Sequence, residues 1–186
     1  MKELSPASLG LILTAMTLGS CSGQKYTNST FGFSVDVPAG TPTCRSEPTQ
    51  PDHGLDMFLD SGPDGCEKLQ TRPYLGVFAE YNAAMAPNPD AVLAGLNHLK
   101  GIHRGTAPEL QIPRRPSAVA RVDRDDGWVE IWVVTQAWKW PPPAEESDLS
   151  YVNYIVTLNT TPQRLERDLR RLRALLGKVR IFEPGR

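Results

Sequence analysis

Apolar and polar residues alternate with a period of two in six segments of the chain, and this period predicts β-strands. The pattern is cleanest over residues 31–37, where aromatic and aliphatic side chains occupy every second position and a proline follows. The other five segments are 55–59, 74–81, 117–123, 128–138 and 151–159. The Arg-Asp-Asp-Gly stretch at 124–127 joins two of them and predicts a hairpin. We interpret the six segments as antiparallel strands.

Two further segments have the period of an amphipathic α-helix. Asn88 is a good N-cap, and Pro89 and Asp90 suit the first turn of the helix that follows it. Gly101 can end that helix. A second helix is predicted after Thr161. Its apolar stripe consists of Leu165, Leu169, Leu172 and Leu176.

Together these elements predict one α+β domain over residues 31–182, with an antiparallel sheet of five to six strands flanked by two amphipathic helices. A length of 186 residues suits a single domain. The run Phe-Gly-Phe-Ser-Val-Asp-Val-Pro-Ala-Gly at 31–40, with a closing strand, Thr-Pro and leucine-striped helix, resembles the PsbP/Mog1-like group. The resemblance implies an antiparallel sheet with flanking helices and a non-catalytic binding or assembly function.

The N-terminal segment 1–20 is typical of an export signal. Its apolar run, residues 9–18, has the length of a signal-peptide h-region and is too short to span a bilayer as a helix. The run leads into Leu-Gly-Ser-Cys at 18–21, which resembles the bacterial lipobox. The resemblance implies a lipoprotein in which Cys21 is lipidated and becomes the new N-terminus. The alternative is an ordinary secretory signal cleaved near Ser20.

Lipidation would place the protein in the bacterial cell envelope, with the membrane as its first partner. Residues 21–30 are polar and predict a short tether. Ser22 follows the cysteine where an aspartate would, in enteric bacteria, favour the inner membrane. By that analogy we expect the periplasmic face of the outer membrane.

The other two cysteines, Cys44 and Cys66, lie in a loop-rich stretch of an exported chain. A disulfide between them is the default in an oxidising compartment and would stabilise the fold by roughly 3 kcal/mol. A metal pair is less favoured because the sequence has neither a CxxC spacing nor a nearby His-x-His. A free thiol is the other alternative.

Charge and motifs argue against several classes of function. The chain has 20 Lys and Arg against 21 Asp and Glu, for a net charge of −1, so we expect no nucleic-acid partner. His53, His98 and His103 are not spaced as a ligand pair on one helix face. The sequence has no Gly-x-Ser-x-Gly elbow and no phosphate-binding glycine loop. We therefore expect no metal, no cofactor and no catalytic residue.

The candidate binding residues lie on and just after the strand predicted at 128–138. They are Trp128, Glu130, Trp132, Gln136, Trp138 and Trp140. If the strand is unbroken, the first five share one face, and aliphatic residues line the other under the helices. Indole rings between polar groups suit stacking on a carbohydrate or anchoring a protein partner. The alternative is that other segments cover this face and the rings belong to the core.

We therefore interpret the chain as a lipid-anchored, non-enzymatic periplasmic binding protein. Small size, an anchor and a disulfide fit an inhibitor or immunity protein that blocks a secreted toxin or a cell-wall hydrolase. An envelope assembly factor of PsbP/Mog1-like type is the alternative, and a hydrolase is less favoured.

Overall fold

The computed structural model describes residues 23–45, 52–60, 66–95, 101–105, 107, 109–139 and 151–185. They form two β-sheets, two α-helices and a 3-10 helix. The strands are β1 (Gln24–Asn28), β2 (Phe33–Val37), β3 (Thr43–Arg45), β4 (Gly54–Phe58), β5 (Tyr74–Tyr81), β6 (Ile102–Gly105), β7 (Ala118–Asp123), β8 (Val129–Lys139), β9 (Tyr151–Thr160) and β10 (Arg180–Ile181). The helices are η1 (Cys66–Thr71), α1 (Pro89–Ala94) and α2 (Leu165–Leu176).

The larger sheet has seven strands in the order β3-β4-β5-β9-β8-β7-β6, and every neighbouring pair is antiparallel. The smaller sheet has the order β1-β2-β10 and is also antiparallel. The antiparallel α+β prediction is thus confirmed, and the hairpin predicted at 124–127 joins β7 to β8. The prediction of one sheet with five to six strands is wrong, because two sheets with seven and three strands are present.

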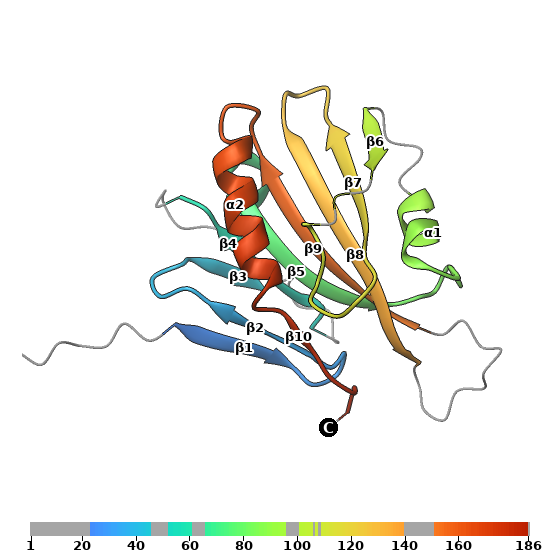
Figure 1. The fold of residues 1–186 in the computed structure, drawn as a ribbon. Coiled ribbons are helices and arrows are strands. Elements are labelled where there is room, and N and C mark those ends of the chain that lie inside the picture. Colours follow the sequence, from blue (N-terminus) through green and yellow to red (C-terminus); the bar gives the residue numbers. More distant parts are fainter. Residues whose placement is uncertain are drawn as a thin grey trace, which may run out of the picture.

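The main core lies between the larger sheet and a second layer formed by α2 and the smaller sheet (Figure 1). Phe31 and Phe33 are fully buried in it, and the hydroxyl of Tyr154 on β9 donates a hydrogen bond to the carbonyl of Phe31 at 2.7 Å. The leucine stripe of α2 packs on the same face of the larger sheet as Ile131 and Val133. The aliphatic face of β8 therefore lies on the α2 side of the sheet, as predicted. The prediction that both helices cover this face is wrong for α1, because Leu93 of α1 packs on the opposite face with Val134 and Trp132.

The opposite face of the larger sheet is partly covered by α1. Asn88 caps this helix as predicted, because its side-chain oxygen accepts a hydrogen bond from the Ala91 N–H at 2.9 Å. Leu93 is buried against residues of β7, β8 and β9. The helix is six residues long and ends at Ala94, well before Gly101. Its contacts with the sheet are mainly with β7 and β8, so it covers one end of that face.

Asp168 connects the first turns of α2 to the end of β9 through hydrogen bonds. The Thr160 hydroxyl donates to the Asp168 carboxylate at 2.7 Å, and Arg164 donates to it at 3.0 Å. Burial alone would raise the pKa of this carboxyl, but the hydrogen bonds from Thr160 and Arg164 and the nearby arginine charges lower it. Asp168 is therefore a buried anion held by donors from both elements.

Several predicted boundaries are corrected by the structure. Gln24–Asn28, expected within a tether, form β1 instead, because they pair with β2 and bury Tyr26 and Asn28. Strands β3 and β6 lie in segments where no strand was predicted. The last helix begins at Leu165 because the residues after Thr161 form hydrogen-bonded turns first.

The predicted disulfide is confirmed. Cys44 on β3 is bonded to Cys66 at the start of η1, with their Cα atoms 5.6 Å apart. It ties an edge strand of the larger sheet to the segment that leads into β5. The export signal at 1–20 and Cys21 lie outside the described residues. In the part of the chain that is described, no helix is long and apolar enough to cross a membrane.

Candidate functional site

A group of polar side chains lies on the face of the larger sheet that is turned away from α2. One row of directly paired residues crosses four strands: Asp56 on β4, Gly76 on β5, Thr157 on β9 and Trp132 on β8. The adjacent row contains Tyr74 on β5, Asn159 on β9 and Glu130 on β8. Residues two apart on a strand share a face, so both rows project to the same side.

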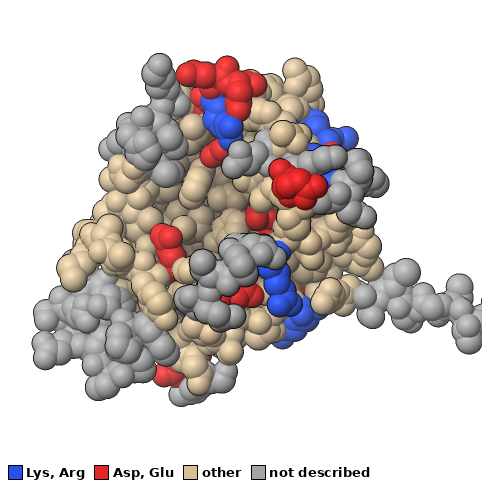
Figure 2. Space-filling model, turned by 180° about the vertical axis from the view of Figure 1, so that it is seen from behind, with Lys and Arg blue, Asp and Glu red and all other residues tan. Residues whose placement is uncertain are grey.

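These rows border a pocket of about 280 Å³, which we call the sheet-face pocket. Its wall includes Tyr74, Phe78, Glu130, Trp132, Thr157 and Asn159. Figure 2 shows this side of the molecule, hollowed near its middle, with acidic side chains around the hollow. The volume is close to the lower end of the range for small-molecule sites, about 300 Å³.

Four buried polar atoms in these rows have no hydrogen-bond partner: Asp56 Oδ1, Thr157 Oγ1, and both Nδ2 and Oδ1 of Asn159. Their side chains are 4%, 7% and 2% exposed, respectively. Buried polar groups are nearly always hydrogen-bonded, and an unsatisfied one costs about 1–3 kcal/mol. Among the described residues no other buried side chain has such an atom, so the cost is concentrated on this one face.

Gly76 keeps the middle of the polar row open. A Cβ on Gly76 would lie 2.5 Å from Thr157 Oγ1 and 2.8 Å from Asp56 Oδ1, and it would also collide with the Phe78 ring. Glycine weakens the interior of a strand and often marks a place where another group approaches closely. Here the missing side chain lets polar atoms from β4 and β9 reach one space.

Burial sets the protonation of the titratable groups in this face. It raises the pKa of Asp56 to about 7. Burial also raises the pKa of Tyr74 to about 12, and the negative charges of Asp56 and Glu130 add to that rise. At neutral pH the site therefore offers a neutral phenol, a hydroxyl, an amide and a carboxyl that is partly protonated.

Two of the predicted binding residues, Glu130 and Trp132, line the sheet-face pocket. The Trp132 indole N–H donates to Glu130 Oε2 at 3.1 Å, and Arg124 donates to Glu130 Oε1 at 2.8 Å. Gln136 lies farther along β8 and has a structural role, because its amide donates to the carbonyl of Ala86 and to the side chain of Asn153.

The other predicted tryptophans do not line this pocket. Trp128 is half-buried beside the β7–β8 hairpin. Trp138 lies at a β-bulge after Ala137, with a φ of 54°, so the strand is not unbroken and the shared face ends there. Its ring is 38% exposed and lies 5.7 Å from the guanidinium of Arg115. Trp140 lies outside the described residues.

Asp56, Gly76, Thr157 and Asn159 were not among the predicted binding residues. They occupy polar or glycine positions of strands that alternation predicted, and all four are buried. The signal was present in the residue types, because asparagine and glycine are disfavoured within strands. A polar residue on a long strand such as β9, which has neighbours on both sides, is therefore a sign of a site or a network.

The two histidines in the described part of the chain, His53 and His103, have different surroundings. His53 borders the sheet-face pocket, and its Nδ1 lies 2.9 Å from the carbonyl oxygen of Ala79. His103 Nε2 lies 3.3 Å from the Asp123 carboxylate on an exposed part of β6 and β7. His98 lies outside the described residues. No cluster of three or more potential metal ligands is present in the segments that the structure describes.

In comparisons with known proteins, this chain shows similarity at the level of structure only. No protein-family model and no curated protein matches the sequence. Among solved structures, the chain is similar to the solution structure of cyanobacterial PsbP (CyanoP) from Synechocystis sp. PCC 6803, with a TM-score of 0.49. The two are 12% identical, and the match covers 95% of this chain and 98% of that one. At this identity no residue role is transferred to the present chain.

Proposed function

We propose that the protein is a non-enzymatic binding protein of the bacterial cell envelope, and that the sheet-face pocket binds a neutral saccharide. The observation that carries the proposal is the set of unpartnered buried atoms on Thr157 and Asn159, which line the pocket, with Asp56 in the same cross-strand row as Thr157. A ligand that pairs with them would form the hydrogen bonds that folding leaves unmade.

The residue types in the pocket favour a ligand rich in hydroxyl or amide groups. Thr157 and Asn159 can each both donate and accept, as a sugar hydroxyl or an acetamide group can. Trp132 and Tyr74 add aromatic rings to the wall, which suit the apolar face of a sugar ring. No lysine or arginine is among the described residues that line the pocket, whereas Glu130 is, which disfavours an anionic ligand.

The contacts of Glu130 favour binding over glycoside hydrolysis. Asp56 lies on β4 and Glu130 on β8, with β5 and β9 between them. Glycoside hydrolases use two carboxyl groups that both act on the glycosidic bond. Glu130 is engaged by Arg124 and Trp132.

Protein-observed NMR titration with N-acetylglucosamine and its dimer tests the proposed ligand class. We expect the largest shift changes at the amides of Gly76, Thr157 and Asn159. Trp132→Ala should weaken binding, whereas Trp128→Ala, outside the pocket, should not. A wild-type protein whose spectrum does not change at millimolar sugar would refute the saccharide assignment.

The envelope location rests on lipidation of Cys21 and has its own test. In a bacterial host, the wild-type protein should fractionate with membranes and carry the added mass of the lipid. Cys21→Ser should move it to the soluble fraction, with the Cys44–Cys66 disulfide intact. Wild-type protein without added mass in the soluble fraction would argue against the anchor.

Two roles fit such a protein: an inhibitor or immunity protein against a secreted toxin or cell-wall hydrolase, and an envelope assembly factor. A deletion strain distinguishes them. Loss of an assembly factor gives an envelope defect in the absence of any challenge. Loss of an inhibitor gives a defect only when the toxin or hydrolase is present.

A further inference from the structure

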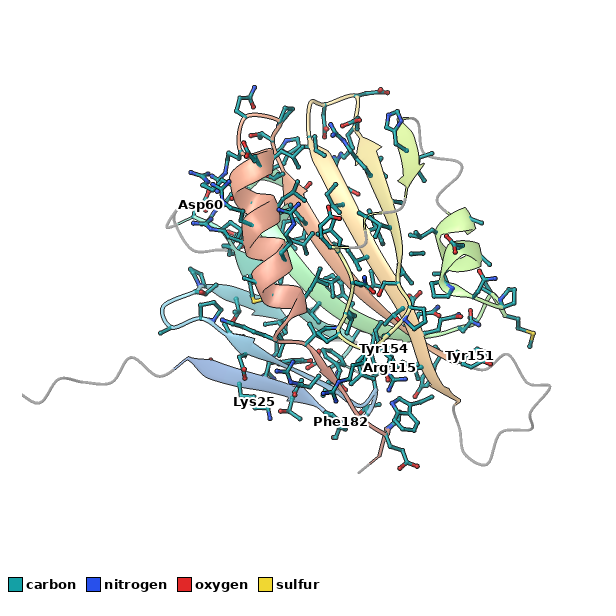
Figure 3. The ribbon with its side chains drawn as sticks, viewed as in Figure 1. Lys25, Asp60, Arg115, Tyr151, Tyr154 and Phe182 are labelled. Atoms are coloured by element: carbon teal, nitrogen blue, oxygen red, sulfur yellow. A yellow bond between two sulfur atoms is a disulfide. The ribbon has the colours of Figure 1, made fainter. Side chains whose placement is uncertain are left out.

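A second pocket, of about 550 Å³, lies where the chain leaves α2 and meets the loop before β7. We call it the arginine pocket, because Arg114, Arg115 and Arg180 line it together with Ile112, Val179 and Ile181. Figure 3 shows Arg115 beside Tyr154, below the C-terminal end of α2 and above Phe182. This pocket is separate from the sheet-face pocket and shares no lining residue with it.

The backbone on both sides of the arginine pocket is anchored in the core. Ile112 is 2% and Val179 is 3% exposed. The Ser117 hydroxyl accepts a hydrogen bond from the Ile112 N–H and donates one to the Arg115 carbonyl. Ile181 pairs with Phe33 of β2. The arginines therefore project from fixed segments, which lowers the entropy lost when a ligand binds them.

The arginines of this pocket differ from those of the last helix in their partners. All five arginines between residues 164 and 173 have a carboxylate within 4 Å: Arg164, Arg167, Arg170, Arg171 and Arg173. In the described part of the chain, no ion pair involves Arg114, Arg115 or Arg180, and no carboxylate lines their pocket. Three cationic residues thus line one pocket without a matching anion among its lining residues.

Two of these arginines are held in place by other contacts. Arg180 donates from Nη1 to the carbonyls of Gly177 and Val179, and its Nε and Nη2 have no described partner. Arg115 lies over the Trp138 ring, a favourable position for a guanidinium. These contacts orient the two guanidinium groups and leave donors available to a ligand.

Arg114 has an unfavourable backbone conformation. Its φ of 65° lies in the left-handed region, which residues other than glycine rarely adopt. Such conformations occur preferentially at functional sites, where the surrounding structure imposes them. The chain therefore keeps a strained arginine at the pocket where a glycine would fit the backbone better.

We propose that the arginine pocket binds a phosphate-bearing ligand. The planar guanidinium matches phosphate with two parallel hydrogen bonds, and three of them suit a multiply charged group. The phosphate could belong to an anionic lipid headgroup or to a soluble phosphorylated molecule. The chemistry of recognition is the same for both.

The full chain with Cys21→Ser, which cannot carry a lipid anchor, is the protein for the test. One arm measures binding of inorganic pyrophosphate by calorimetry. The other arm measures binding to vesicles of phosphatidylglycerol with phosphatidylcholine, against vesicles of phosphatidylcholine alone. Arg114→Gln and Arg115→Gln should each weaken binding by about tenfold, the effect of losing one charge-assisted contact. Arg170→Gln, whose side chain is 63% exposed on α2, is the matched control and should bind as before.

Arg114→Gly separates a ligand role from a structural one. Glycine relieves the backbone strain, so this variant should unfold at a higher urea concentration and still bind more weakly. Binding of pyrophosphate supports a soluble source, and binding confined to the anionic vesicles supports a lipid headgroup. The proposal is overturned if neither probe binds, or if Arg170→Gln loses as much affinity as the pocket variants.

Discussion

Gly76 on β5 lies directly opposite Asp56 on β4, and an added Cβ at Gly76 would come within 2.8 Å of Asp56 Oδ1. The same Cβ would lie 2.5 Å from the hydroxyl of Thr157 on the other neighbouring strand. The space above Gly76 is therefore bordered by polar atoms from both sides. The size of this space depends on the absence of a side chain at Gly76.

Filling that space should damage both the fold and the pocket. We expect Gly76→Ala to lower the free energy of unfolding by about 1–3 kcal/mol, because the methyl group overpacks a buried position. Urea denaturation measures this, and NMR titration should show that saccharide binding is lost. Gly95→Ala is the control, since a Cβ there meets nothing within 4 Å and its φ is −59°. Equal losses in the two variants would contradict the argument.

Removing an unpartnered hydroxyl should stabilise the protein while it weakens binding. Thr157→Val keeps the shape and deletes Oγ1, so the free energy of unfolding should rise by about 1 kcal/mol. Thr135→Val is the matched comparison, because the Thr135 hydroxyl is buried and donates to the carbonyl of Pro116 at 2.6 Å. That variant should lose about 1–2 kcal/mol. The argument is contradicted if Thr157→Val and Thr135→Val change the free energy of unfolding in the same direction.

The raised pKa of Asp56 predicts a pH-dependent stability. The folded chain holds this proton up to about pH 7, whereas the unfolded chain releases it near 3.8. Stability should therefore decline as pH rises from about 4 to 7 and stay low above that. Asp56→Asn removes this decline and should be more stable than wild type at pH 8, by up to roughly 4 kcal/mol. Urea denaturation of both proteins at a series of pH values checks this prediction. A stability difference between Asp56→Asn and wild type that does not change with pH would contradict it.

Asp168 should stabilise the attachment of α2 in the opposite pH range. Because the pKa of this carboxyl is lowered in the fold, its contribution is present at neutral pH and is lost as pH falls below about 4. We expect Asp168→Ala to cost about 2–4 kcal/mol, since it leaves the buried Thr160 hydroxyl without its acceptor and removes one acceptor from Arg164 and Arg171. Glu166→Ala, on a side chain that is 94% exposed, should change stability by less than about 1 kcal/mol. Similar losses of stability in Asp168→Ala and Glu166→Ala would mean that the buried contacts of Asp168 do not stabilise the attachment of α2.

The strands that the sequence predicted and those it missed differ in position. The four that it missed are β1, β3, β6 and β10, and each lies at the edge of its sheet. Edge strands pair on one side only and can be very short, so few of their side chains need to be apolar. The predicted strands all lie in sheet interiors, where alternation is enforced by burial. Local pattern therefore identified the interior of both sheets and missed their margins.

The candidate site was predictable only in part, for a similar reason. Trp132 and Glu130 stood out because the tryptophans cluster in the sequence. Asp56, Gly76 and Thr157 are far apart in the chain and become neighbours only through the pairing of β4, β5 and β9. Trp138 was assigned to the wrong place because nothing in the local pattern indicates the bulge after Ala137. Cys44 and Cys66 were paired correctly because only two cysteines remained once Cys21 was set apart.

The pairing of β10 with β2 makes the smaller sheet dependent on a segment that is synthesised after every strand of the larger sheet. Ile181 pairs with Phe33, so β2 has neighbours on both sides only after translation has passed residue 181. A nascent chain, or one clipped by a protease after α2, presents the unpaired edge of β2. An open edge of this kind pairs readily with another chain. The short strand β10 covers this edge at Phe33 and Ser34. Its removal should therefore be detectable as aggregation before any loss of the larger sheet.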